Sequence, residues 1–509
     1  MNQTISAKTI RSVIAASSVG TMIEWYDFYI FGMLAKTIST QFFPEGNATA
    51  ALLSTLAIFA AGFIVRPFGA LVFGRLGDLV GRKYTFLLTL VLMGGSTFLI
   101  GLVPSYKTIG IAAPLCVLLL RLLQGLALGG EYGGAATYVA EHAPAHKRGY
   151  YTSWIQTTAT VGLFVALGII MLVKLNMSDE SFNAEWGGWR YPFWISILLV
   201  AVSVYIRLKM EESPLFSKLK SEGKTSANPL KESFRHKANF KMVLLALFGA
   251  VMGQGVVWYT GQFYAQSFLE NVCKIEFEQS RTIMLWAIAF ATPFFLFFGW
   301  LSDKVGRKWI MLAGMLLGIL TYRPIFSSFL NDSNPIKWED TKTENFAFFE
   351  GGLKERLKQL EDSTWRLAYE IPFENGGKTL VSLTYKSADI QQQPTSIVYT
   401  NKHLPPTTYW KFIGLVFLLI LYVTMVYGPI AAFLVEMFPT KIRYTSMSLP
   451  YHIGNGVFGG LVPFIGLLLT TTFPKDPLVG LWYPIGVAVL CFIIGVIYLR
   501  NKIDEEVND

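Results

Sequence analysis

Long apolar runs dominate the chain, and short polar loops separate them. Each run is close to the ~20 residues that a helix needs to cross the hydrocarbon core of a membrane. The first run carries acidic residues and is full length, so we interpret it as a retained helix rather than a signal peptide. The pattern predicts an all-α integral membrane protein with twelve transmembrane helices. We place them at 12–35, 50–73, 84–103, 111–138, 152–174, 189–208, 241–268, 281–301, 309–330, 411–434, 444–470 and 478–499.

Composition agrees with this pattern. Of the 509 residues, 52% are hydrophobic and 15% are charged, whereas soluble domains carry about 25% charged residues. Three cysteines are too few for a disulfide framework. The composition therefore excludes a secreted disulfide scaffold, a soluble enzyme and a disordered chain.

The net charge of +9 is distributed unevenly along the chain. Lys and Arg concentrate near both termini and in the loops that follow even-numbered helices. The positive-inside rule then places both termini in the cytoplasm. We expect the membrane to be the inner, cytoplasmic membrane. We interpret the basic loop 207–241 as a topology signal that meets anionic lipid, and we expect no nucleic-acid partner.

Two loops recur along the chain. Residues 74–83 (GRLGDLVGRK) match 299–308 (GWLSDKVGRK), and 141–148 (EHAPAHKR) match 436–443 (EMFPTKIR). A repeat of this kind indicates duplicated structural units. It predicts two pseudo-symmetric six-helix halves, at 1–209 and 241–509, joined by a cytoplasmic linker at 210–240.

The second half contains extra sequence. The two copies of the second loop (141–148 and 436–443) lie about 70 residues further apart in the chain than the two copies of the first loop (74–83 and 299–308). This difference indicates an insertion between helices 9 and 10. It falls at 331–408, on the outer side. A helix-like pattern at 351–362 and alternation at 378–385 and 395–400 predict a small extracytoplasmic α+β module. The alternative is a poorly ordered loop.

Charged residues occur inside the predicted membrane helices of the first half. Inserting a charged side chain at the bilayer centre costs about 2.5–3.5 kcal/mol of free energy, so each such residue requires a structural or functional explanation. They are either a proton and substrate site or a buried ion-pair network that joins helices. A carboxylate can take up and release a proton, whereas an arginine stays charged and could hold a substrate carboxylate. The candidates are Glu24, Asp27, Arg66, Arg121, Gln124 and Glu131.

The second half offers fewer candidates. Gln254 and Trp258 share a helix face, and Trp258 with Tyr259 could contact a cationic substrate through cation–π attraction. His452 could carry a proton, and Asn455 lies one turn further on. The alternative is that these residues are packing or structural polar groups. Two histidines in the loop at 142–146, with no cysteine or acidic triad nearby, do not indicate a metal site.

Two six-helix halves with the repeated loops 74–83 and 299–308 resemble the major facilitator superfamily. The closer resemblance is to its metabolite:proton symporter family, on Gly20–Gly32, Arg66–Gly69, Arg121–Gly134 and Phe433–Pro439. The resemblance implies that helices 1, 4, 7 and 10 line a central cavity, which points Asp27, Arg121 and Gln124 at the substrate. It also implies that the repeated loops gate the cytoplasmic side. The gating candidates are Gly74, Asp78, Arg82, Glu141, Arg148, Asp303, Arg307, Glu436 and Arg443.

Together these features predict a proton-coupled symporter that imports a small polar organic solute by alternating access. Arg66 and Arg121 favour an organic acid, whereas the acidic residues with Trp258 favour a zwitterion such as betaine or proline. The same features are compatible with an uncoupled facilitator or exporter of this fold, and with a receptor-like docking protein that uses the insertion. The glycines at 74–83 do not match a phosphate loop, so we expect no ATP and no enzyme activity. We also expect no cofactor and a functional monomer.

Overall fold

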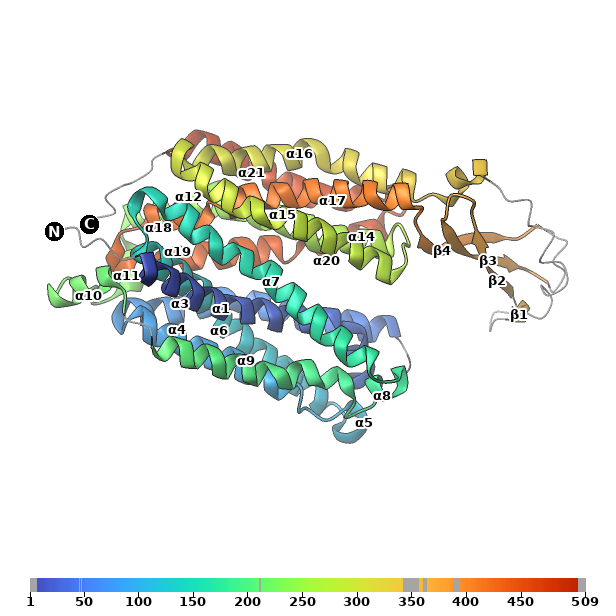
Figure 1. Cartoon of the computed structure of the whole chain (residues 1–509), viewed down its shortest axis with the longest axis horizontal. Coiled ribbons are helices and arrows are strands. Elements are labelled where there is room, and N and C mark those ends of the chain that lie inside the picture. Colours follow the sequence, from blue (N-terminus) through green and yellow to red (C-terminus); the bar gives the residue numbers. More distant parts are fainter. Residues whose placement is uncertain are drawn as a thin grey trace.

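The protein is a bundle of long helices with a small β-sheet projecting from one end (Figure 1). The computed structural model describes residues 7–44, 46, 48–209, 212–341, 357–359, 364–387 and 393–501. The long helices up to α9 form one half of the bundle, and those from α12 onward form the other (Figure 1). We call them the first half and the second half.

The helices of the first half run from α1 to α9. Their bounds are α1 Ala7–Met33, α2 Ala35–Phe42, α3 Ala48–Leu79, α4 Arg82–Ile100, α5 Tyr106–Ile109, α6 Ala112–His142, α7 Arg148–Leu175, α8 Asp179–Asn183 and α9 Tyr191–Leu208. Two short helices follow in the linker, α10 Pro214–Ser221 and α11 Pro229–Arg235.

The helices of the second half are α12 Lys237–Ala246, α13 Met252–Tyr259, α14 Ala265–Asn271, α15 Phe277–Val305, α16 Arg307–Asp332, α17 Pro406–Tyr427, α18 Ile430–Met437, α19 Arg443–His452, α20 Val462–Thr472 and α21 Trp482–Tyr498. Several of them are segments of one membrane crossing. Thus α12 to α14 form helix 7, α17 and α18 form helix 10, and α19 and α20 form helix 11.

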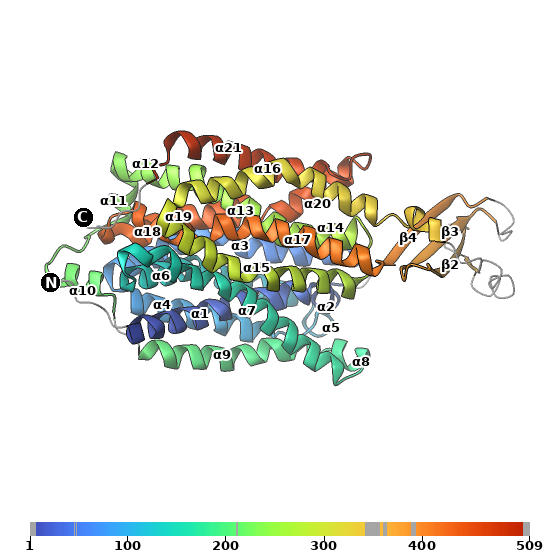
Figure 2. The same cartoon turned by 45° about the horizontal axis from the view of Figure 1, so that its top comes forward.

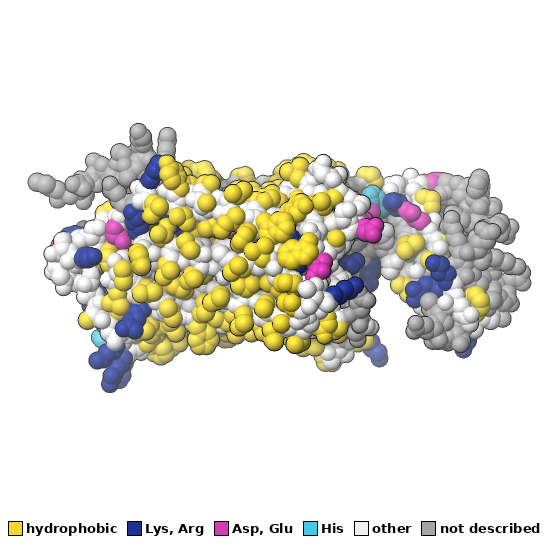
Figure 3. Space-filling model, turned by 90° about the horizontal axis from the view of Figure 1, so that it is seen from below, with side chains coloured by type: hydrophobic (Ala, Val, Ile, Leu, Met, Phe, Trp, Pro, Cys, Tyr) yellow, Lys and Arg dark blue, Asp and Glu magenta, His cyan; other side chains and the backbone are white. Residues whose placement is uncertain are grey.

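Eleven helices of the described chain are long and apolar enough to cross a membrane. Helix α1 carries two acidic residues and is the twelfth long helix; it packs against α7, α6 and α9. Apolar side chains cover the flank of the bundle, and charged ones gather towards its two ends (Figure 3). An apolar belt of this kind suits contact with lipid. The prediction of a twelve-helix membrane fold is confirmed.

The two ends of the bundle differ. Helices α10 and α11, the start of α1 and the end of α21 lie at one end, and the β-sheet lies at the other (Figures 1 and 2). We call these the linker end and the sheet end. Because α6 begins at the sheet end and finishes at the linker end, residue numbers along it give depth in the bundle (Figure 1).

The insertion contains a four-stranded antiparallel sheet in the order β1-β2-β3-β4. The strands are β1 Leu357–Gln359, β2 Trp365–Pro372, β3 Lys378–Tyr385 and β4 Ser396–His403. The strands predicted at 378–385 and 395–400 are confirmed. The helix predicted at 351–362 is wrong for 357–359, because Leu357 pairs with Leu367 of β2; the rest of that range lies outside the described residues.

The sheet is attached to the second half through backbone contacts. Lys402 of β4 accepts a hydrogen bond from the Glu276 N–H at 2.8 Å and donates one to the Lys274 carbonyl at 2.9 Å. Gln279 of α15 bonds both the N–H (2.6 Å) and the carbonyl (3.2 Å) of Leu404. The sheet therefore continues the structure of the loop between α14 and α15.

Helices 7 and 11 are interrupted where they approach the middle of the bundle. Helix 7 contains π-helical turns at Leu247–Val251 and Thr260–Tyr264, and helix 11 contains one at Ile453–Gly459. Such turns re-aim side chains and are frequent at functional sites. In contrast, α1, α6 and α7 are continuous.

Candidate functional site

A chain of buried polar side chains links three helices of the first half. Thr97 of α4 donates to Asp27 of α1 at 2.9 Å and accepts from Gln124 of α6 at 2.8 Å. Gln124 in turn accepts a hydrogen bond from Arg121. The structure thus brings together the three residues that the family resemblance points at substrate, through Thr97, which sequence reasoning missed.

This network lies inside the first half. The guanidinium of Arg121 lies over the rings of Phe31 and Phe59, at 4.3 and 4.9 Å. Gly62 of α3 lies against α6, since a Cβ there would be 3.3 Å from the Arg121 carbonyl oxygen. Asp27 and Arg121 are 1% and 4% exposed. Among the described residues, Asp27 Oδ1 and Arg121 Nε have no hydrogen-bond partner.

Glu131 belongs to a different cluster. It forms an ion pair with Arg207 of α9 and accepts a hydrogen bond from Thr89 at 3.0 Å. Arg207 also lies over the Phe86 ring at 3.4 Å. The sequence does not single out Arg207, because it ends an apolar run and begins the basic loop 207–241. Its burial is visible only once α6, α4 and α9 pack together.

We expect Glu131→Gln to destabilise the protein. The substitution leaves Arg207 buried beside a neutral side chain, and breaking a buried ion pair costs about 3–5 kcal/mol. The midpoint of thermal unfolding in detergent should therefore fall. Glu370→Gln, which removes the exposed partner of Lys378 on the sheet, is the control and should leave the midpoint nearly unchanged. An unchanged midpoint for Glu131→Gln would contradict the structural role.

The seam between the two halves is lined with aromatic rings. Trp25 of α1 packs on Trp258 of α13 with centroids 5.0 Å apart, and Phe63 of α3 lies 6.0 Å from Tyr259. Phe263 continues the wall towards the sheet end and contacts both Phe28 and Tyr29. Trp258 and Tyr259 thus belong to an aromatic wall to which both halves contribute.

Polar atoms without partners gather at this wall. The buried atoms Glu24 Oε2, Arg66 Nε, Trp258 Nε1 and both ring nitrogens of His452 make no hydrogen bond among the described residues. Arg66 interacts electrostatically with Glu24, Tyr259 and His452. Its guanidinium lies 4.4 Å from the centre of the Phe63 ring. Buried polar groups normally have partners, so a solute bound at this cluster could supply the missing ones.

Gln254 and Asn455 satisfy each other. Gln254 donates to the Asn455 amide oxygen at 3.1 Å, and Asn455 donates to the Gln254 oxygen at 2.9 Å. Asn455 also donates to the Tyr451 carbonyl at 3.2 Å. This reciprocal pair joins helices 7 and 11, and its amides are already engaged.

The first copy of the repeated loops ties the halves together at the linker end. Asp78 forms an ion pair with Arg82 at 3.1 Å and accepts hydrogen bonds from the N–H (2.9 Å) and hydroxyl (2.7 Å) of Thr445. Thr445 lies in the first turn of α19, so Asp78 meets the positive end of a helix in the opposite half. Glu141 pairs with Arg443 of that half at 2.9 Å.

The second copy makes the mirror set of contacts. Asp303 pairs with Arg307 at 2.6 Å and accepts from the N–H groups of Gly149 and Tyr150, each at 2.8 Å, at the start of α7. Glu436 pairs with Arg307 at 2.8 Å and approaches Arg148 of the first half at 3.6 Å. We call these cross-half contacts, together with the ion pairs of Arg82 and Arg307 that support them within each half, the latch. Eight of the nine gating candidates take part in it.

Glycine is required at three positions of the repeated loops. Gly81 and Gly306 precede α4 and α16 with φ of +135° and +92°, a region that favours glycine. Gly74, the ninth gating candidate, lies against α19, where a Cβ would be 3.0 Å from the Thr445 Cα. Close approach of α3 and α19 thus explains Gly74.

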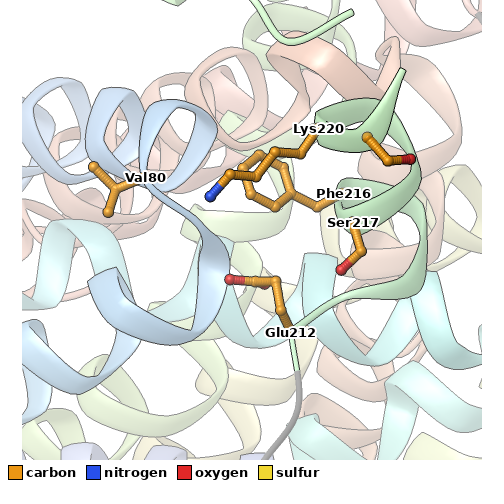
Figure 4. A pocket seen from close by; sticks show the side chains of 6 residues that line it. Val80, Glu212, Phe216, Ser217 and Lys220 are labelled. Atoms are coloured by element: carbon orange, nitrogen blue, oxygen red, sulfur yellow. The ribbon is translucent and has the colours of Figure 1, made fainter. Parts of the chain in front are cut away.

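The linker rests on the latch. Ser213 donates a hydrogen bond to Glu141, and the Phe216 ring lies 4.5 Å from the Arg82 guanidinium. Glu212 accepts from the Arg82 N–H at 3.1 Å at the start of α4. A shallow pocket beside it is lined by Val80, Glu212, Phe216, Ser217, Lys220 and Ser221 (Figure 4). This pocket is remote from the aromatic wall, and we assign it no role in transport.

Comparison with known proteins agrees with this architecture. The family model described as "Sugar (and other) transporter" matches residues 13–233. XylE of Escherichia coli in a partially occluded inward-open conformation superimposes with a TM-score of 0.61 at 16% identity, over 97% of this chain and 99% of XylE. A double-tryptophan mutant of XylE gives 0.68 at 15% identity, over 97% of each chain. At these identities the likeness shows the fold.

Sequence relatives show the family. The inner membrane metabolite transport protein YhjE of Escherichia coli K12 is 33% identical over 466 residues, 91% of this chain and 88% of YhjE. The alpha-ketoglutarate permease of the same strain is 30% identical over 97% of this chain and 94% of the permease. The proline/betaine transporter of that strain is 34% identical over 62% of this chain and 64% of the transporter. The chain is a multi-pass membrane transporter rather than an enzyme, and it belongs to the major facilitator superfamily and, within it, to the metabolite:proton symporter family.

Proposed function

We propose that the protein imports a small organic acid together with protons across the cytoplasmic membrane, by alternating access between 1–209 and 241–509. In this proposal 210–240 is a cytoplasmic linker, both termini are cytoplasmic, the insertion 331–408 is extracytoplasmic and the monomer is the working unit. The observation that carries the choice of substrate is Arg66. It is a cation in the seam between the halves that forms no ion pair within the described chain.

Arg66 contrasts with the arginines near the linker end. Those five arginines each lie within 4.0 Å of a carboxylate oxygen, whereas Arg66 has aromatic rings beside it and forms no ion pair within the described chain. A buried arginine that has no carboxylate at ion-pair distance suits a bidentate substrate carboxylate. The five paired residues are Arg82, Arg148, Arg207, Arg307 and Arg443.

Asp27 is our candidate for the proton site. It is buried, one of its oxygens is held by Thr97, and Arg121 is joined to it only through Gln124 and Thr97. A carboxyl that is not locked in a direct ion pair can exchange its proton as the surroundings change. Glu131, in contrast, pairs directly with Arg207, which favours a structural role. Glu24 and His452 remain secondary candidates beside Arg66.

The latch supports alternating access. Asp78 and Asp303 each meet the first turn of a helix in the opposite half, so the linker end is closed in this structure. Transport to the cytoplasm requires these contacts to break. A few kcal/mol of differential stability is enough to bias two such states.

A zwitterion is the second candidate substrate. Glu24 lies close enough to Arg66 for electrostatic interaction, and Trp258 and Tyr259 form an aromatic face beside them. That arrangement could hold a quaternary ammonium. The relatives include a transporter named for alpha-ketoglutarate, which is a dicarboxylate, and others named for proline and betaine. The unpaired Arg66 makes us favour the acid.

Ligand-induced stabilisation tests the substrate class. A bound ligand raises stability by RT ln(1 + [L]/Kd), about 2.7 kcal/mol at one hundred times Kd. A mono- or dicarboxylate should therefore raise the unfolding midpoint of the purified protein, whereas betaine and proline should leave the midpoint unchanged. A shift with betaine or proline alone would favour the zwitterion instead.

Removal of the sheet distinguishes a carrier from a docking protein. Lys411 at the start of α17 bonds Asp332 at the end of α16 at 2.7 Å, so the two helix ends are close enough to be joined by a short glycine–serine turn. We expect a variant that lacks 334–404 to retain uptake, because the seam residues lie in the bundle. A folded variant that no longer transports would favour a function that depends on the insertion.

A further inference from the structure

Three buried tyrosines meet between the aromatic wall and the latch. Tyr132 of α6 and Tyr451 of α19 stack with ring centroids 3.7 Å apart and planes 4° from parallel. The hydroxyl of Tyr427, at the end of α17, lies 2.8 Å from that of Tyr451. Tyr132 belongs to the first half and the other two to the second, so the stack crosses the seam.

Each side of the stack is held by its own half. Gln156 of α7 donates to the Tyr132 hydroxyl at 2.7 Å, within the first half. Tyr427 holds Tyr451 within the second half. The hydrogen bond that supports each ring lies within one half, so these two bonds can persist when the halves separate and the stack breaks.

The tyrosines separate the wall from the linker end. Tyr427 contacts the ring of Trp258 at 6.5 Å on the site side. On the other side, Tyr451 and Thr445 are six residues apart on α19, which corresponds to about 9 Å along a helix. Helices α6 and α19 pack together across the seam. The three rings therefore lie in the seam between the aromatic wall and the latch.

We infer that Tyr132, Tyr427 and Tyr451 form an inner gate whose cross-half stack holds the linker end closed together with the latch. The inference rests on the proposed function only for the identity of the cargo. Stacked aromatic pairs add stability beyond the area that they bury. Removing one ring should therefore shift the protein towards the state that is open at the linker end.

A cysteine at position 448 reports this opening. Ser448 is fully buried on α19 between Thr445 and Tyr451, and it faces Gly133 of α6 across the seam. A cysteine there can react with a maleimide only when the halves separate. The protein's own cysteines are Cys116, Cys273 and Cys491. Cys273 and Cys491 are buried and Cys116 is exposed, so labelling of the chain without the substitution gives the background.

The measurement is the rate of maleimide labelling of purified Ser448→Cys protein without substrate. We expect Tyr132→Ala and Tyr451→Ala each to raise the rate about tenfold, which corresponds to the loss of a buried aromatic contact. Tyr132→Phe keeps the ring and should change the rate less than threefold or so. Tyr138→Ala is the matched control, because Tyr138 is a buried tyrosine on the same helix that packs within the first half; it should leave the rate unchanged.

Two results would overturn the inference. One is an unchanged labelling rate in both alanine variants; the other is an equal rise with Tyr138→Ala, which would indicate general loosening. If an alanine variant does not purify as a folded monomer, Tyr132→Leu and Tyr451→Leu keep apolar volume without the stack and should raise the rate in the same way. Because no substrate is present, failure here is distinct from failure of the proposed organic-acid import.

Discussion

Replacing Arg66 by glutamine is expected to raise the KM for uptake of the organic acid by about 10- to 100-fold. Hydrogen bonds to charged groups contribute about 1.5–3 kcal/mol, and each 1.4 kcal/mol is a tenfold change. Arg66 is the cation of the seam that has no ion pair within the described chain, so its loss removes the group that we propose for the substrate carboxylate. Initial uptake rates over a range of substrate concentrations give the KM.

Two control variants sharpen this experiment. Arg66→Lys keeps the charge but loses the bidentate geometry of the guanidinium. Its KM should therefore lie between those of the parent protein and Arg66→Gln. Arg323→Gln removes an arginine that is 35% exposed near the sheet end and lies 3.6 Å from Asp476; it should leave the KM unchanged. A KM for Arg66→Gln within twofold or so of the parent value would mean that another group binds the carboxylate.

Asp27→Asn is expected to abolish accumulation driven by a pH gradient while exchange of solute continues. Asparagine can still accept the hydrogen bond from Thr97, so the helices stay in place, but it cannot carry a proton. The ratio of internal to external solute should then fall to the equilibrium value. Counterflow of labelled solute, which needs no net proton movement, should persist.

Glu131→Gln is the matched control for this prediction. It neutralises another buried carboxyl of the same half, one that pairs directly with Arg207. The folded fraction of that variant should still accumulate solute when a pH gradient is imposed. Full accumulation by Asp27→Asn would exclude Asp27 as the proton site and direct attention to Glu24.

Much of the fold could be predicted from the sequence because the membrane imposes it. Apolar runs of about 20 residues must be helices where no water can satisfy the backbone, and the twelve runs correspond to twelve observed helices or helix groups. Local pattern was less decisive outside the bundle. Residues 357–359 lie in a segment with a helix-like pattern, yet they pair with residues 365–367 of β2, because strand formation depends on the partner strand as well as on the local pattern.

The site was predictable to the extent that charges in the membrane stand out. Asp27, Arg121 and Gln124 are joined as neighbours through Thr97, but Thr97 is one of many threonines and carries no signal of its own. Tyr132 and Tyr451 likewise look like ordinary apolar-helix tyrosines until the two halves are packed together. Residues that meet across a seam are set by tertiary packing, and periodicity along one helix cannot show them.

Proton-coupled import of an organic acid is tested most directly by substrate-induced proton movement. Purified protein is placed in liposomes that contain a pH-sensitive dye, and carboxylates, amino acids and betaines are added outside one at a time. We predict that a carboxylate acidifies the lumen in the parent protein and not in Asp27→Asn. If a labelled carboxylate enters the liposomes of the parent while the lumen pH stays constant, the protein is an uncoupled facilitator and proton coupling is contradicted.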